Sequence, residues 1–426
     1  MIQPMKFKLT YVVILVVLAS VLVYAQSMNQ QLAYFLVAIL MVPLWVHLLM
    51  DRNYQRHLVC FLGNSVSFLV AFFLYGAVQI SHLSAGVTTH ALLFIGGYAY
   101  FFLGFFFLIP LVINSDKFDI RRFFVVLGIG LTGIALLGYA TGPIQILEER
   151  MFTYRAYSTS IGSLPGLQSF LGNPNSYGAI MMISLFSSLS IAFERKSFFN
   201  KYTLNSAVLF VGLVFSFARS AYLGFATMAI LSFLINKRFR RIILRVLLGG
   251  VIILALLVMC HIDMFSWMRP FLQLDKANMR LDLWAASYQV ILERPLIGWG
   301  EQDLGVLLTR YISPGMAAYG YGPHNTYLRL ALSGGIVGFV AIMYICISSL
   351  LMSYKGVKKG VKQARWIFPL LGGLLVHVFF EVNTVGGAGT VSLVFTVLLG
   401  WSQLLHIKTV TPGKRANEIN ALQKNV

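Results

Sequence analysis

Residues 330–354 read LALSGGIVGFVAIMYICISSLLMSY, and this stretch between Arg329 and Lys355 contains no charged side chain. A helix of about 20 apolar residues crosses the roughly 30 Å hydrocarbon core of a bilayer, so the stretch is long enough to span a membrane. Similar runs recur along the chain, which is 58% hydrophobic and 11% charged and has a mean hydropathy of +0.78. A soluble domain needs far more charged surface than this. The sequence therefore predicts an integral membrane protein.

We predict about twelve transmembrane helices, each of roughly 20 residues. Their approximate limits are residues 9–25, 31–50, 58–80, 87–113, 122–141, 175–193, 202–217, 220–235, 242–261, 324–352, 366–380 and 388–406. The predicted fold class is an all-α polytopic membrane protein. Residues 1–410 form a single integral membrane domain in this prediction, and residues 411–426 form a short cytoplasmic tail.

The basic side chains gather in alternate connections between the apolar runs. They cluster at residues 6–8, 52–56, 117–122, 195–201, 237–245 and 355–365 and in the tail. By the positive-inside rule these connections face the cytoplasm, which places both termini inside. The net charge of +19 is thus explained by topology, and we predict membrane lipids, and no nucleic acid, as partners.

The opposite, outer side carries the two longest connections, residues 142–174 and 262–323. The second contains Trp267, Trp284 and Trp299, half of the six tryptophans, and its segment 272–292 is amphipathic. Interfacial tryptophan is typical of segments that lie along a membrane surface. We therefore predict surface helices in this loop and, because long ordered loops are usually functional, an active site that faces outward.

Three side chains on the outer side are candidates for chemistry. Arg219 lies in a very short connection, where a charge at the membrane edge is costly and usually functional; the alternative is an arginine that reaches lipid headgroups. Arg280 lies in the amphipathic segment, where the alternative is a surface salt bridge with Asp282 or Asp275. His324 opens a span, where a neutral imidazole acts as a general base; the alternative is a structural histidine that caps the helix.

Four further residues are candidates for contacts with substrate, namely Asn175, Asn325, Arg329 and Glu381. Arginine pairs hold phosphate or pyrophosphate groups through bidentate hydrogen bonds, so an anionic, lipid-linked substrate is expected. The cytoplasmic connections carry no nucleotide-binding motif and no acidic cluster, so we predict no cofactor and no metal. The string GIGLTG at residues 128–133 lies inside a predicted span, where small residues pack helices together.

Four patches resemble the superfamily of O-antigen ligases and O-antigen polymerases. They are GNPN at residues 172–175, the Ser-x-x-Arg-Ser patch at 216–220, Arg280 followed by RPLIGWG at 294–300, and HNTYL at 324–328 followed by GGIVG at 334–338. Each patch alone is common, but their order and spacing together are specific. The chain departs from many members at Ser333, where they have an acidic residue.

The resemblance implies a GT-C-like fold and a metal-independent glycosyltransferase of the bacterial cytoplasmic membrane. The donor would be a glycan on undecaprenyl diphosphate. Carried over by position, Arg219 and Arg280 would bind the donor diphosphate, and His324 would be the catalytic residue that activates the acceptor hydroxyl.

Two classes of acceptor are compatible with this reaction. A polymerase would join lipid-linked repeat units, which we favour; a ligase would transfer the glycan to a lipid A core, a cell-wall polymer or a protein. A transporter of the same lipid-linked glycan is a third alternative, although the sequence shows no paired repeats with broken helices. A chain-length regulator and a flippase of the same pathway would be further partners.

Overall fold

The computed structural model describes residues 9–24, 30–82, 89–115, 118–142, 144–146, 149–151, 154–159, 162–195, 200–241, 275–301, 304–313, 322–383 and 385–410. Its first half contains α1 (Leu9–Leu22), α2 (Gln30–Met50), α3 (Arg52–Asn64), α4 (Val66–Ser81), α5 (Thr89–Leu103), the π-helical turn η2 (Gly104–Leu108), α6 (Ile109–Ser115) and α7 (Ile120–Thr141). Four short strands follow, β1 (Ile144–Ile146), β2 (Glu149–Met151), β3 (Tyr154–Thr159) and β4 (Gly162–Leu167), and then the 3-10 turn η3 (Ser169–Leu171).

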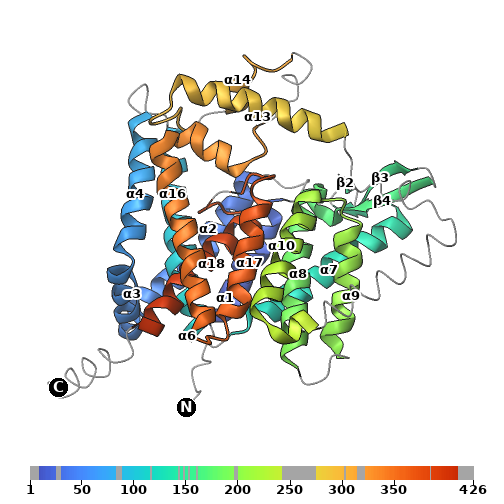
Figure 1. Ribbon diagram of the computed structural model, residues 1–426, viewed down its shortest axis with the longest axis horizontal. Coiled ribbons are helices and arrows are strands. Elements are labelled where there is room, and N and C mark those ends of the chain that lie inside the picture. Colours follow the sequence, from blue (N-terminus) through green and yellow to red (C-terminus); the bar gives the residue numbers. More distant parts are fainter. Residues whose placement is uncertain are drawn as a thin grey trace.

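The second half is again helical. It contains α8 (Pro174–Glu194), α9 (Lys201–Val214), α10 (Arg219–Ile235), α13 (Asp275–Glu293), α14 (Leu304–Leu308), α16 (Thr326–Lys358), α17 (Ala364–His377) and α18 (Thr390–Val410). The helices form one bundle, and α13 and α14 lie across one end of it (Figure 1). The predicted amphipathic segment 272–292 corresponds to α13.

The prediction of an all-α polytopic membrane protein is confirmed. Among the described residues, six helices are long and apolar enough to cross a membrane, and a bent pair, α3 with α4, counts as a seventh if it is one span. Four shorter apolar helices, α1, α9, α10 and α17, match further predicted spans. The predicted span 242–261 lies outside the described residues, so the count of about twelve stays a prediction, as does the GT-C likeness.

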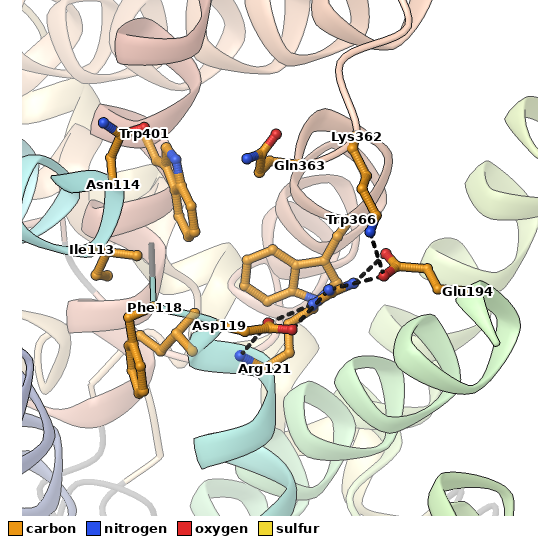
Figure 2. A pocket seen from close by; sticks show the side chains of 11 residues that line it. Ile113, Asn114, Phe118, Asp119, Arg121, Glu194, Lys362, Gln363, Trp366 and Trp401 are labelled. Carbon is orange, nitrogen blue, oxygen red and sulfur yellow. Dashed lines mark hydrogen bonds and ion pairs between the residues drawn. The ribbon is translucent and has the colours of Figure 1, made fainter. Parts of the chain in front are cut away.

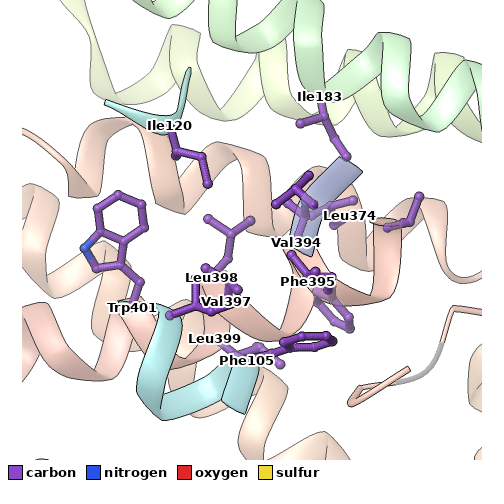
Figure 3. Close-up of a cluster of buried hydrophobic side chains, with 14 of the residues drawn as sticks. Phe105, Ile120, Ile183, Leu374, Val394, Phe395, Val397, Leu398, Leu399 and Trp401 are labelled. Carbon is purple, nitrogen blue, oxygen red and sulfur yellow. The ribbon is translucent and has the colours of Figure 1, made fainter. Parts of the chain in front are cut away.

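The centre of the bundle is α18. In its apolar stretch Thr390–Ile407, 94% of the residues are buried inside the protein, which leaves almost no face for lipid. Figure 3 shows side chains of α18 packed against Phe105, Ile120, Ile183 and Leu374, which come from η2, α7, α8 and α17. A helix that is apolar all round is stable where other helices surround it. The remaining helices are thus arranged around α18.

The basic residues of α7 and of the connection before α17 lie at one end of the bundle. Figure 2 shows Arg121, at the start of α7, between Asp119 and Glu194; its Nε donates to Asp119 Oδ1 at 2.7 Å and its Nη1 to Glu194 Oε1 at 2.6 Å. Lys362, before α17, lies 3.3 Å from Glu194 Oε2. A pocket of about 570 Å³ is lined by these side chains and by Trp366. We call the end of the bundle that carries Arg121 and Lys362 the basic end.

The predicted span 58–80 is bent in the structure. Helices α3 and α4 meet at Ser65 with a bend of 75°. The first of the two helices begins with Arg52 and Arg56, whose charges favour the membrane surface over the apolar layer. The other end of α3 packs into the bundle, where Phe61 is 1% exposed and its ring contacts Phe106 and Phe107.

The described part of the connection 142–174 contains two antiparallel hairpins, which the sequence analysis did not predict. Strand β1 pairs with β2, and β3 pairs with β4 so that Tyr154 lies opposite Leu167. The backbone N–H of Leu167 also donates to the carbonyl of Phe215, after α9. The second hairpin is thereby joined to the connection between α9 and α10.

Helix α16 is broken at Gly335, which has φ +57° and ψ −161°. Residues 295–300, called the strap here, lie across the break. Trp299 N and Gly300 N donate to the carbonyls of Leu332 and Ser333 at 2.8 and 2.9 Å, and Ile336 N and Val337 N donate to those of Pro295 and Leu296 at 2.8 and 3.2 Å. The main-chain groups that the break would leave without partners are thus satisfied by the strap, as burial requires.

The strap approaches α16 so closely that glycine is needed on both sides. A Cβ atom at Gly298 would lie 2.5 Å from Gly335 N and from Leu332 O, and Gly298 has φ +68°. Gly298 and Gly335 belong to two of the patches quoted above, RPLIGWG and GGIVG. Their presence is explained by this crossing of main chains.

We expect Gly298→Ala to lower the free energy of unfolding by about 2–4 kcal/mol, because the substitution adds backbone strain and overpacking at once. The measurement is the midpoint of thermal unfolding in detergent. Gly130→Ala in α7 is the matched control, since a Cβ there meets nothing within 4 Å and alanine favours a helix. Equal midpoints for Gly298→Ala and the wild-type protein would show that the strap does not depend on this glycine.

Candidate active site

The side chains of Arg219, Arg280, His324 and Glu381 lie together at the end of the bundle opposite to the basic end. Helix α10 begins with Arg219 and runs toward the basic cluster at 237–241, and α16 begins just after His324 and ends at Lys358. Helix α13, which carries Arg280, lies across this end (Figure 1). The structure thus brings together four of the residues that the sequence analysis singled out.

The loop after α17, residues 378–383, holds these elements in place. Arg280 donates from Nη1 to the Phe380 carbonyl at 2.9 Å and from Nη2 to Glu381 Oε1 at 2.8 Å. Thr326, in the first turn of α16, donates two hydrogen bonds to the same loop. Its N–H donates to the Val378 carbonyl at 3.0 Å, and its hydroxyl donates to the Glu381 carbonyl at 2.8 Å. The loop therefore fixes α13 and the start of α16 relative to each other.

Among the described side chains, Arg280 forms its ion pair with Glu381 and not with Asp282, while the alternative pairing with Asp275 stays a prediction. We considered Asp282 and Asp275 because they are near in sequence, but the recorded ion pair is with Glu381, 101 residues away. The carboxylate is 12% exposed and the guanidinium 23% exposed, so both are largely desolvated. The side chain of Asp275 lies outside the described residues.

A tryptophan ties the same helix to the His324 segment. Trp284 donates from Nε1 to the Pro323 carbonyl at 3.0 Å, and its ring packs edge-on against Phe379 at 5.3 Å between centroids. Trp284 lies one turn after Arg280 on α13. Trp284 thus links the helix that carries Arg280 to the residue just before His324.

Asn325, and not His324, caps α16. Asn325 Oδ1 accepts from Tyr327 N at 2.8 Å and from Leu328 N at 3.1 Å, as an N-cap residue does, and Asn325 is only 2% exposed. The alternative in which His324 is the cap is thus wrong. His324 itself has φ +44°, an uncommon backbone conformation for histidine that occurs often at functional sites.

Charge at this end is unevenly balanced. Burial, and then the positive charge of Arg280, lower the pKa of His324 below its ordinary value of 6.5. Burial raises the pKa of Glu381, and Arg280 opposes that effect. Arg219 also lies within electrostatic range of Arg280. Two guanidinium groups next to one carboxylate and a neutral imidazole make a site that favours an anion.

The turn before α10 places Arg219. Ser216, Phe217 and Ala218 are buried, and Phe217 has φ +53°. Ser216 and Ala218 lie against Gly178 in α8, where a Cβ atom would meet their side chains at 2.8 and 2.5 Å. Asn175, one turn earlier in α8, is half-buried and lies at the same end; its N–H donates to the capping Asn173 Oδ1 at 2.8 Å.

Arg329 is not part of this group. Its Nη2 donates to Glu301 Oε2 at 2.6 Å, next to the strap, while Tyr327, two residues earlier, donates to the Leu375 carbonyl in α17 at 2.7 Å. Residues two apart in a helix point in nearly opposite directions. Arg329 therefore lies on the face of α16 turned away from α17.

Two polar residues near the site were missed in the sequence analysis. His377, the last residue of α17, is 1% exposed, and its ring forms a hydrogen bond with the backbone of Ser220, next to Arg219. Glu301 follows the strap and is 7% exposed. Both carried a usable signal, because an ionisable residue at the end of an apolar run or directly after a glycine motif is a candidate for function.

Comparison with known families tests the resemblance. The O-antigen ligase family model matches residues 204–343. The matched segment contains Arg219, Arg280, the strap and His324. The resemblance to the superfamily of O-antigen ligases and polymerases is thereby confirmed.

A curated relative agrees with this. The chain is similar to the ComP-specific O-oligosaccharyltransferase of Acinetobacter baylyi, with 25% identity over 222 residues, which is 50% of this chain and 39% of that protein. The chain thus spans about two fifths of the length of the relative it matches. Together the comparisons support a glycosyl-transferring membrane enzyme of the O-antigen ligase superfamily.

We expect Arg280→Lys to reduce the rate of glycan transfer at least about tenfold, which corresponds to about 1.4 kcal/mol. A lysine ammonium is a point charge and cannot hold the Phe380 carbonyl, Glu381 and a phosphate in one planar fork. The measurement is the initial rate of transfer. Arg241→Lys, an exposed change at the basic end, is the control; equal rates for both variants would contradict the expectation.

The pH dependence of the transfer rate should reflect the protonation state of His324. A base must be neutral, so the rate is expected to rise with pH through a pKa below 6.5 and to level off above it. In Arg280→Gln the positive charge that lowers the pKa of His324 is absent. The pKa of His324 should therefore rise, and the rising part of the pH–rate curve of the residual activity should move to higher pH. A limb that stays in place in this variant would mean that another group titrates.

Proposed function

We propose that this chain is a ligase-type glycosyltransferase that moves a glycan from undecaprenyl diphosphate to a hydroxyl group of a separate acceptor. The observation that carries the proposal is the close grouping of Arg219 and Arg280 with a partly buried His324 of lowered pKa. The superfamily match is consistent with it.

In the proposed reaction, the two arginines bind the donor diphosphate. His324 takes the proton from the acceptor hydroxyl, whose oxygen attacks the anomeric carbon of the glycan. The bond between that carbon and the diphosphate oxygen breaks, and undecaprenyl diphosphate leaves with the electron pair. Two guanidinium groups balance the charge that develops on the leaving group, so the step as proposed needs no metal.

The ion pair between Arg280 and Glu381 has a role in this proposal. Without substrate the Glu381 carboxylate holds the Arg280 guanidinium at 2.8 Å. An arriving diphosphate carries more negative charge and more acceptor oxygens, and it would share or displace Glu381. The arginine is thus positioned before the donor binds, which reduces the entropy lost on binding.

The comparisons favour transfer to a separate acceptor over polymerisation. The matched family is described as O-antigen ligase, and the relative is named an oligosaccharyltransferase. Our first preference, the polymerase, stays a prediction. The acceptor class, whether lipid A core, wall polymer or protein, is part of the proposal to be tested.

We also propose the orientation. The basic end of the bundle would face the cytoplasm by the positive-inside rule, which turns the site outward, across the bacterial cytoplasmic membrane. A flippase would then have to deliver the donor to the outer leaflet, and a chain-length regulator would be a further partner for the polymerase alternative.

The proposal is tested with purified protein in vesicles, supplied with the host's undecaprenyl-diphosphate oligosaccharide. We expect glycan transfer once a host acceptor extract is added, and a loss of at least about a hundredfold in His324→Ala, since a general base contributes this much or more. His47→Ala, at an exposed histidine toward the basic end, is the control and should keep wild-type activity.

The other outcomes are distinct. A ladder of longer lipid-linked glycans without acceptor would identify a polymerase. Intact substrate that crosses the bilayer under both conditions would identify a transporter. Normal transfer by His324→Ala would remove this residue from the mechanism.

A further inference from the structure

Four tyrosines from different elements gather on the face of α16 that carries Arg329. They are Tyr24 after α1, Tyr34 in α2, Tyr75 in α4 and Tyr98 in α5. Arg329 lies within electrostatic range of Tyr34 and Tyr98. The ring centroids of Tyr75 and Tyr98 are 5.8 Å apart. With Gln79, Glu301 and Arg329, these residues are called the tyrosine cluster.

The tyrosine cluster has no excess of positive charge. The guanidinium of Arg329 is balanced by Glu301 at 2.6 Å, and Glu301 also accepts from the Tyr75 hydroxyl at 3.0 Å. The group around His324 differs, because there two arginines share one carboxylate. The first arrangement suits an uncharged ligand, whereas the second suits a diphosphate.

Several polar groups of the tyrosine cluster remain available. Gln79 is 6% exposed, and its Nε2 donates to the Ser333 carbonyl at 3.3 Å, but its Oε1 has no hydrogen bond among the described residues. Arg329 Nε likewise donates none there, although the side chain is 31% exposed. Tyr34 is 42% exposed. Buried polar groups normally have partners, so an acceptor and a donor at one place indicate a polar ligand or water.

The tyrosine cluster adjoins the candidate active site through the loop after α17. The Tyr24 hydroxyl donates to Asn383 Oδ1 at 3.2 Å, and Asn383 N donates to the Thr326 hydroxyl at 2.9 Å. Tyr24 also lies within electrostatic range of Glu381, the partner of Arg280. One turn of α16 therefore separates a charged site at His324 from a neutral, aromatic one at Arg329.

We propose that the tyrosine cluster is the acceptor subsite, and that it binds a neutral, hydroxyl-rich sugar ring of the acceptor beside the donor diphosphate. The ring of Tyr34, which is 42% exposed, would pack against the apolar face of the sugar, while Tyr75 and Tyr98 pack on each other and support the site. The Gln79 amide and the Arg329 guanidinium would bind its hydroxyls, a lining typical of small-ligand sites. The inference rests on the proposed function, because it assigns the second substrate of that reaction.

The test uses Tyr34→Ala, which removes a half-exposed ring and hydroxyl, in the same vesicle assay. The probe is the host acceptor extract that supports transfer, serially diluted. We expect the half-saturating amount of acceptor to rise at least about tenfold, while the half-saturating donor concentration changes less than about twofold. Tyr11→Ala, at a 58% exposed tyrosine in α1, is the matched control and should change neither value.

A second variant separates binding from folding. Tyr34→Phe keeps the ring, and we expect an intermediate rise in the half-saturating amount of acceptor with an unchanged midpoint of thermal unfolding. An unchanged acceptor dependence in both variants, with active wild-type protein, would overturn the subsite and leave the proposed function standing; a lowered unfolding midpoint alone would assign the tyrosine cluster to the fold. Wild-type protein without transfer would overturn the proposed function itself.

Discussion

Four main-chain hydrogen bonds between the strap and the break in α16 constrain this end of the protein more than any side chain does. In an apolar layer an open helix break is costly, because its carbonyl and N–H groups have no water to bind. The strap satisfies them, and the close crossing of the two main chains requires Gly298 in the strap and Gly335 in α16. Helix α13 ends just before the strap, so the position of Arg280 depends on contacts that lie several turns away from it.

The second constraint is the loop after α17. It holds Arg280 through one carbonyl and one carboxylate, it binds the first turn of α16 through Thr326, and His377 just before it contacts the backbone beside Arg219. Three segments that are distant in sequence thus meet on one short stretch. Like-charged arginines repel each other when nothing lies between them. A fold that nevertheless places them together, with one carboxylate, has an arrangement typical of an anion-binding site.

Much of this architecture follows from patterns that are local in the sequence. Uncharged runs predict α7, α8 and α18 within a few residues, and alternate basic clusters identify the end that carries Arg121 and Lys362. The bend at Ser65 could not be predicted from hydropathy alone, because α3 and α4 form one continuous run of helix-compatible residues. The hairpins were missed because their strands are only three to six residues long.

The site was predictable as a set of residues but not as a set of contacts. Arg219, Arg280 and His324 were identified from position and from the resemblance, whereas the pairing of Arg280 with Glu381 joins residues 101 positions apart. Sequence proximity favoured Asp282, and the tertiary fold overrode it. The cap of α16 is likewise supplied by Asn325, whereas the alternative considered from the sequence gave this role to His324.

The crossing of the strap and α16 also bears on how proteins of this kind can be recombined. A long surface loop is usually treated as an exchangeable cassette when acceptor range is to be transferred between relatives. Here the main chain of residues 295–300 is in hydrogen-bond register with residues 332–337, so a loop grafted without its own helix break would meet the wrong backbone. The smallest unit that keeps the register intact runs from the start of α13 to just beyond Val337, and chimeras are best joined outside these limits.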